Sequence, residues 1–167
     1  MNAFIPALLA VLLAKFGGRS TQFTRLSRLS LAATLLGLSV GIAAFAGFSL
    51  APTMNAHARA LMLGVALVLM GCGQFGKAIL GDPPASFAGT LLFVWRSGAP
   101  FLAFAFAIWK AAPVSAAAGA LAGTVAAVAL SAVPLPPGRL RWFRRLSGMI
   151  LIMTGGYAAL WALRLIA

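Results

Sequence analysis

Acidic residues are almost absent from this chain, in which Asp82 is the only Asp or Glu among 167 residues. Paired carboxylates, which serve general acid–base chemistry and hold hard metal ions, are therefore excluded. The sequence also lacks a phosphate-binding loop, a catalytic triad and the spacing of zinc ligands. We predict that the protein is not an enzyme and that it holds neither a cofactor nor a bound metal.

Cysteine and histidine each occur once. A single cysteine excludes an intramolecular disulfide, and because Cys72 lies in an apolar segment between two glycines, we interpret it as a helix-packing residue. His57 lies in a short polar connection without a second metal ligand nearby, so we interpret it as a solvated loop residue.

Charged residues of either sign make up only 8% of the chain, whereas 62% of the residues are hydrophobic. Roughly a quarter of the residues of a soluble globular domain are charged, so the composition predicts an integral membrane protein. A membrane-spanning helix needs about 20 mostly apolar residues. Hydropathy predicts six such segments, at residues 2–23, 31–51, 58–79, 85–109, 112–133 and 146–166.

The remaining charges are basic, with 13 Lys and Arg residues and a net charge of +12. In a soluble protein this balance would indicate nucleic acid, but here most cations lie in short connections between apolar segments. Lipid headgroups and the positive-inside rule account for them, so we expect the bilayer, and no nucleic acid, as a partner. One side of the membrane receives Arg25, Arg28, Lys77, Arg139, Arg141, Arg144 and Arg145, and the other only Arg59, Lys110 and Arg164. This bias predicts both termini in the periplasm, outside a bacterial inner membrane.

The second half of the sequence resembles the first. Gly64 and Gly71 of the third segment have counterparts in Gly148 and Gly155 of the sixth, at one constant separation. Repeats of three spans each enter the membrane in opposite orientations, which is the plan of many secondary transporters. We therefore predict an all-α fold of six transmembrane helices in two inverted three-helix repeats, residues 1–80 and 81–167.

Both repeats begin with an interrupted apolar segment, AVLLAKFGGRSTQF at 10–23 and TLLFVWRSGAPFLAF at 90–104. Paired polar, glycine-containing breaks are the best sequence indication of a transport site. The predicted substrate or ion pathway comprises Lys15, Gly17, Gly18, Arg19, Ser20, Thr21 and Gln22 from the first break and Trp95, Arg96, Ser97 and Gly98 from the second.

This layout resembles the second calcium/cation antiporter family, the GDT-one group of Golgi and bacterial manganese or calcium/proton exchangers. These are six-helix, twofold-repeated chains in which each repeat begins with E-x-G-D-(K/R)-(S/T), usually followed by Gln. The aligned residues of the first copy are Lys15, Phe16, Gly17, Gly18, Arg19, Ser20 and Thr21 or Gln22. Of these, Gly17, Arg19 and Ser20 match the motif, whereas Lys15 and Gly18 stand in place of its acids.

The second copy aligns with VWRSGAP, where Val94 and Ser97 stand in place of the acids. All four family carboxylates are therefore missing. The resemblance implies a secondary transporter that exchanges manganese or calcium for protons, with a degenerate ion site. Two alternatives remain open: a structural or partner subunit without transport activity, and a transporter of an anionic substrate.

Two interpretations remain open for each of the basic side chains within the interrupted segments. Arg96 lies about 16 Å into its predicted helix, where insertion costs at least about 2.5–3.5 kcal/mol, so we expect it to face the bundle interior or a water-filled cavity. Alternatively, it caps carbonyls exposed by the break at Pro100. Lys15 and Arg19, four residues apart, share a helix face if the helix continues through the glycines, and either line the pathway or reach toward the cytoplasmic headgroups.

Overall fold

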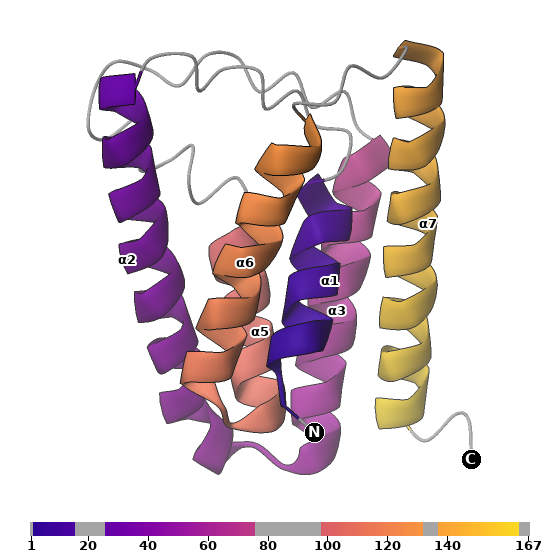
Figure 1. Ribbon diagram of the computed structural model, residues 1–167. Coiled ribbons are helices and arrows are strands. Elements are labelled where there is room, and N and C mark those ends of the chain that lie inside the picture. Colours follow the sequence, from indigo (N-terminus) through magenta and orange to yellow (C-terminus); the bar gives the residue numbers. More distant parts are fainter. Residues whose placement is uncertain (1, 16–25, 76–97, 132–136, 164–167) are drawn as a thin grey trace.

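The computed structural model describes residues 2–15, 26–75, 98–131 and 137–163. Within these ranges the chain is all-α, as predicted, and Figure 1 shows the helices side by side in one bundle. The elements are α1 (Phe4–Lys15), α2 (Leu26–Leu50), the short 3₁₀ helix η1 (Ala51–Thr53), α3 (Ala56–Phe75), α5 (Ala99–Lys110), α6 (Pro113–Ser131) and α7 (Pro137–Ala162).

Three of these helices, α2, α3 and α6, are long and apolar enough to cross a bilayer. Helices α1 and α5 are equally apolar but have only 12 residues each, or about 18 Å of helix against a hydrocarbon core of about 30 Å. The rest of these two predicted spans lies outside the described residues. Helix α7 has 26 residues and includes the four-arginine cluster that the prediction placed before the sixth span.

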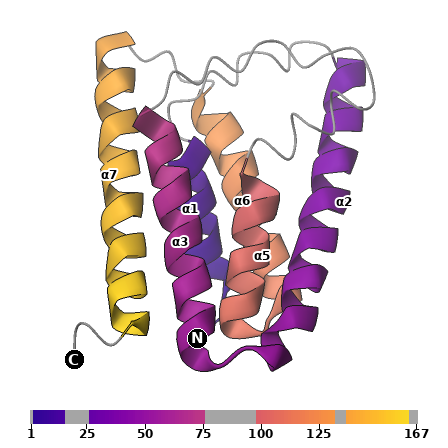
Figure 2. The same cartoon turned by 180° about the vertical axis from the view of Figure 1, so that it is seen from behind.

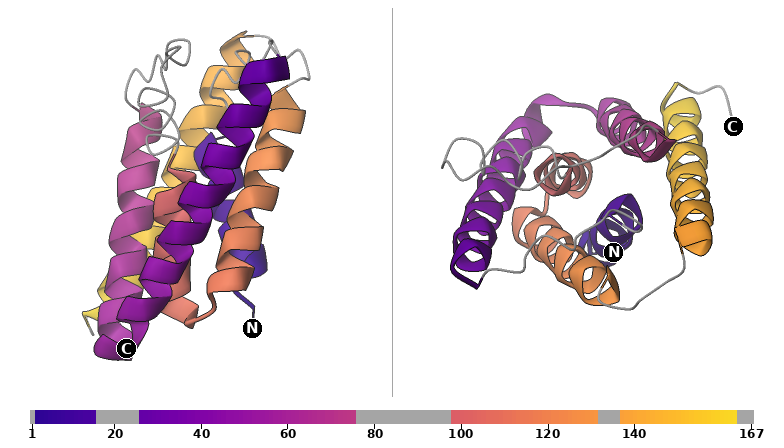
Figure 3. Two further views of the ribbon diagram at one scale, coloured as in Figure 1. Left: turned by 90° about the vertical axis from the view of Figure 1, so that its left-hand side faces the viewer. Right: turned by 90° about the horizontal axis from the view of Figure 1, so that it is seen from above.

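The helices alternate in direction. Followed along the chain in Figure 1, α1, α3 and α6 run upward, and α2, α5 and α7 run downward. Figure 2 shows the same alternation from behind. The view from above in Figure 3 places α1 and α5 in the middle, with α2, α3, α6 and α7 around them.

Local sequence explains several helix ends. Asn55 precedes α3, and its side-chain oxygen accepts a hydrogen bond of 2.7 Å from the N–H of Ala58, as an N-cap residue does. Gly98 precedes α5 with φ of +77°, a left-handed conformation that only glycine adopts freely. Ala111 also has a positive φ, of 51°, in the tight turn before Pro113 begins α6.

Small residues form the centre of the bundle. The largest contribution comes from α5, where Ala99, Leu102, Ala103 and Ala107 are completely inaccessible. Alanine and glycine allow backbones to approach closely, which is how helices associate in a bilayer. A Cβ on Gly119 would overlap the carbonyl oxygen of Phe4, so α6 packs directly on α1. A Cβ on Gly47 would likewise overlap the carbonyl oxygen of Phe104, so α2 packs directly on α5.

The closest extended contact joins α3 to α7. A Cβ on Gly64 would lie 2.7 Å from the oxygen of Gly155, and one on Gly71 would lie 2.7 Å from the oxygen of Gly148. Real Cβ atoms are not found that close to a carbonyl, so these positions accept only glycine at the present helix separation. Cys72, next to this contact, is exposed. Its interpretation as a packing residue is therefore wrong, because the neighbouring glycine and not the thiol faces α7.

Candidate functional site

Two of the predicted pathway residues lie in the described part of the chain, Lys15 at the end of α1 and Gly98 at the start of α5. The others, Gly17, Gly18, Arg19, Ser20, Thr21, Gln22, Trp95, Arg96 and Ser97, lie outside the described residues. The structure thus fixes the two helix ends that border the predicted breaks.

The end of α1 is tied to α3 by one side chain. The amide nitrogen of Gln74 donates a hydrogen bond to the carbonyl oxygen of Ala14. The last carbonyls of a helix have no partner within the helix, so this bond satisfies one of them. Lys15 is the last residue of α1 and is partly buried.

The start of α5 contacts α3 about one helical turn from Gln74. A Cβ on Gly98 would overlap Sδ of Met70, so glycine lets the left-handed turn lie directly against this side chain of α3. The carbonyl oxygen of Gly98 accepts the first helical bond of α5, 3.0 Å from the nitrogen of Leu102. Pro100 occupies the first turn, where its missing N–H costs no hydrogen bond.

Met70 and Gln74 are four residues apart on α3, which is about 6 Å along the helix. The described helix ends next to the two predicted breaks therefore lie against neighbouring turns of one helix. At this level α1 presents its C-terminal carbonyls, which carry partial negative charge, and α5 presents its first N–H groups, which carry partial positive charge. Such ends attract ions of opposite charge.

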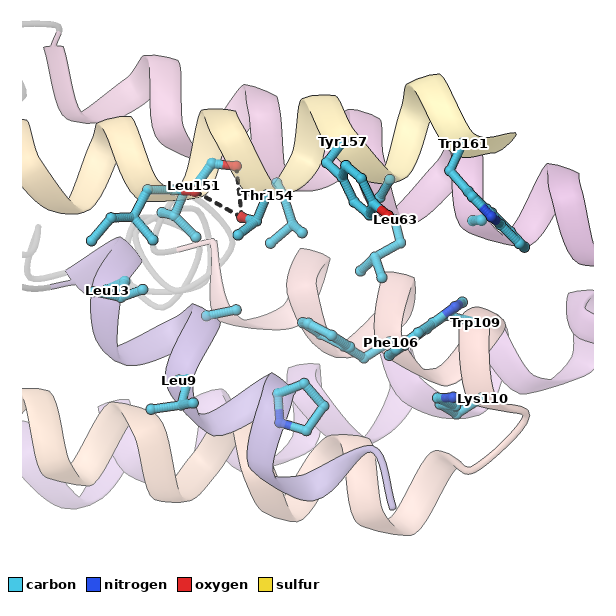
Figure 4. Close-up of a pocket in the computed structure, with 16 residues that line it drawn as sticks. Leu9, Leu13, Leu63, Phe106, Trp109, Lys110, Leu151, Thr154, Tyr157 and Trp161 are labelled. Carbon is cyan, nitrogen blue, oxygen red and sulfur yellow. Dashed lines mark hydrogen bonds between the residues drawn. The ribbon is translucent and has the colours of Figure 1, made fainter. Parts of the chain in front are cut away.

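A cavity of about 720 Å³ lies between α1, α3, α5 and α7. Its walls are mostly aliphatic, and Figure 4 shows Leu13 and Leu151 toward one end and Trp109, Lys110 and Trp161 toward the other. The Thr154 hydroxyl, which also lines it, donates to the carbonyl oxygens of Ile150 and Leu151 in its own helix, at 2.8 and 3.1 Å. The polar character of the cavity is therefore concentrated at the end where α5 stops.

Aromatic rings surround that end. Lys110 Nζ lies 4.0 Å from the centroid of the Trp109 ring, within the range of a cation–π interaction. The rings of His57 and Trp161 have centroids 5.4 Å apart. His57 is thus a partly buried residue in the first turn of α3, and its interpretation as a solvated loop residue is wrong because α3 begins two residues earlier than the predicted span.

Sequence reasoning missed this cavity, because its lining comes from four helices that are distant along the chain. In the sequence, Trp109 and Lys110 lie near the end of one predicted span, and Tyr157 and Trp161 lie near the end of another. These two ends lie at the same end of the bundle because α5 and α7 run in the same direction. Among the described residues, no group of three or more His, Cys, Asp and Glu side chains could hold a metal ion.

Comparison with known proteins adds no relative: no protein-family model, curated protein or solved structure matches this chain.

Proposed function

We propose that this chain is an integral membrane protein and a secondary transporter, built from two inverted three-helix repeats. Three apolar helices of sufficient length support the membrane assignment. The proposed repeats pair α1 with α5, α2 with α6 and α3 with α7. In Figure 1 the two members of each pair run in opposite directions, as inverted repeats require.

The glycine contacts between α3 and α7 support the same symmetry. The repeat aligns Gly64 with Gly148 and Gly71 with Gly155 in sequence. In space the partners are exchanged, since Gly64 meets Gly155 and Gly71 meets Gly148. A twofold axis between α3 and α7 turns the first contact into the second, so one symmetry operation accounts for both.

The observation that carries the transport proposal is that the end of α1 and the start of α5, which adjoin the two predicted breaks, both contact α3. Ala14, next to the end of α1 at Lys15, lies beside Gln74, and α5 starts after Gly98 beside Met70. Secondary transporters commonly bind their substrate where discontinuous helices end near the middle of the membrane. We place the substrate pathway here, between the C-terminal carbonyls of α1 and the first N–H groups of α5.

The resemblance to manganese or calcium/proton exchangers supplies the first substrate to test. Those cations prefer carboxylate ligands, and the motif positions of this chain carry Lys15, Gly18, Val94 and Ser97 instead. We therefore propose that the cation site is degenerate and that native exchange of manganese or calcium is weak. The quadruple variant Lys15→Glu, Gly18→Asp, Val94→Glu and Ser97→Asp returns the four acids.

Flux measurements in proteoliposomes with an imposed proton gradient test this proposal. We expect the quadruple variant to move manganese or calcium at least about tenfold faster than the native protein, because hard cations gain oxygen ligands. As a control, acids placed on the exposed Leu38 and Ile42 of α2 should produce no flux. If neither the quadruple variant nor its control moves manganese or calcium when both proteins are correctly reconstituted, a cation-exchanger scaffold is contradicted.

A second candidate is a transporter of an anionic substrate. It is favoured by Lys15, which is partly buried at the end of α1, and by the positive end of the α5 helix dipole at the same level. An uptake screen with inorganic and organic anions, comparing the native protein with Lys15→Gln, distinguishes it. Anion uptake that is lower in Lys15→Gln than in the native protein supports anion transport. No transport of any tested cation or anion supports a structural or partner subunit.

A further inference from the structure

The cavity between α1, α3, α5 and α7 has an open side. Leu9 on α1 and Tyr157 on α7 both line it and remain 51% and 62% exposed. Leu63 of α3 and Phe106 of α5 form its interior and are almost inaccessible. The cavity is thus a groove, closed by α3 and α5 and open between α1 and α7. In a membrane-embedded bundle this opening faces acyl chains.

The length of the groove matches one leaflet. Along α7 its lining extends from Ile150 to Trp161, which is about 17 Å of helix, close to the depth of one leaflet. One leaflet is half of a hydrocarbon core of about 30 Å. The aromatic end contains Trp109 and Trp161, the residue type that collects at the boundary between hydrocarbon and headgroups.

The charge at that end is positive. Among the described residues that line the groove, Lys110 carries the only charged side chain. No acidic side chain is present in the described residues, since Asp82 lies outside them. The complement of this groove is a molecule with an apolar chain about one leaflet long and an anionic group at its outer end.

We propose that the groove binds one anionic phospholipid from the surrounding bilayer. An acyl chain lies between Leu9 of α1 and the α7 wall, and the headgroup phosphate pairs with Lys110 beside Trp109. This inference depends on the proposed membrane insertion but not on transport activity. Its headgroup end at Lys110 lies at the opposite end of α1 from Lys15, whereas its apolar end reaches Leu13, two residues before Lys15.

Native mass spectrometry of the full-length protein in detergent, titrated with phosphatidylglycerol or phosphatidylcholine, tests the proposal. We expect one phosphatidylglycerol per chain, retained in preference to phosphatidylcholine. In Lys110→Gln the preference should fall about fivefold, because a Lys near the surface adds about 1 kcal/mol to binding of anionic lipid. Arg59→Gln is the matched control, since Arg59 lies at the same end, does not line the groove and donates to the carbonyl oxygen of Met54 at 3.0 Å.

A second variant tests the acyl chain independently of charge. Ala158 lines the groove on α7, and Ala158→Phe should fill it and reduce retention of both lipids. Equal retention of the two lipids by the native protein, or equal losses in Lys110→Gln and Arg59→Gln, would overturn the proposal. If dodecyl phosphate binds and no phospholipid is retained, the proposal is also overturned, because the groove then binds a free amphiphile and not a bilayer lipid.

Flotation with liposomes after an alkaline wash separates this inference from the proposal on which it depends. A protein that floats but retains no phospholipid refutes only the lipid site. A protein that does not float refutes membrane insertion, and the lipid site with it.

Discussion

Helix α3 holds its neighbours through two kinds of contact. It meets α7 backbone to backbone, at Gly64 and Gly71. It contacts the ends of α1 and α5 through two side chains, Gln74 and Met70, although the Cβ of Gln74 also lies against Gly148 of α7. A contact between backbones fixes the distance between helices, whereas a contact through a long side chain tolerates small movements. We interpret α3 and α7 as the scaffold and the ends of α1 and α5 as the adjustable part.

The largest effect is expected from breaking the scaffold. In Gly64→Leu the new side chain meets the oxygen of Gly155 at 2.7 Å and the nitrogen of Ala159 at 2.8 Å, neither of which can rotate away. We expect a loss of about 3 kcal/mol in the free energy of unfolding, at the upper end of overpacking costs. Denaturant unfolding in detergent micelles measures this loss.

Gly156→Leu is the matched control, because Gly156 lies on α7 next to Gly155 and a Cβ there has no atom within 4 Å. Its free energy of unfolding should change by less than about 0.5 kcal/mol. If both variants lose equal stability, backbone contact between α3 and α7 is not what holds the two helices together.

An intermediate effect is expected at the start of α5. Gly98→Ala forces a left-handed conformation on alanine, at a cost of about 1–2 kcal/mol, and it adds the overlap with Met70. The double variant with Met70→Ala should recover only the part due to the overlap. A double-mutant cycle of unfolding free energies separates the two contributions. Full recovery would show that the left-handed conformation at Gly98 carries no cost.

The smallest effect is expected at the end of α1. Gln74→Leu keeps most of the side-chain volume but removes the hydrogen bond to Ala14, so we expect a loss of about 0.5–1 kcal/mol. Gly73→Ala is the control, since a Cβ there meets nothing within 4 Å. A loss in Gln74→Leu as large as that in Gly64→Leu would remove the distinction between scaffold and adjustable contacts.

The sequence predicted the helical class and the apolar segments, because bilayer thickness and hydropathy constrain both without any tertiary information. It also marked Gly64, Gly71, Gly148 and Gly155 as related positions. It did not show that Gly64 faces Gly155 and that Gly71 faces Gly148, since this depends on how α3 and α7 cross. The same limit explains Cys72, which shares a segment with these glycines but lies on another face of α3.

The candidate site was predicted from the segments AKFGGRS and WRSGAP, and of its predicted residues Lys15 at the end of α1 and Gly98 before α5 lie in the described part of the chain. That these segments interrupt the helices stays a prediction. Met70 and Gln74, which bring the two helix ends together, carry no sequence signal, because any side chain of suitable length on α3 could do so. The groove was not predictable, because Leu9, Lys110 and Tyr157 belong to three helices whose relative positions only the fold defines.

The proposed transport requires the space bordered by the ends of α1 and α5 to open to either side of the membrane in turn, and this can be tested without knowing the substrate. In a Cys72→Ser background, Lys15→Cys is treated in sealed proteoliposomes with a membrane-impermeant thiol reagent, added from one side or the other. We predict reaction from both sides, while Ala103→Cys, in the inaccessible centre of α5, stays unmodified. Reaction of Lys15→Cys from one side only, or from neither, would contradict the account.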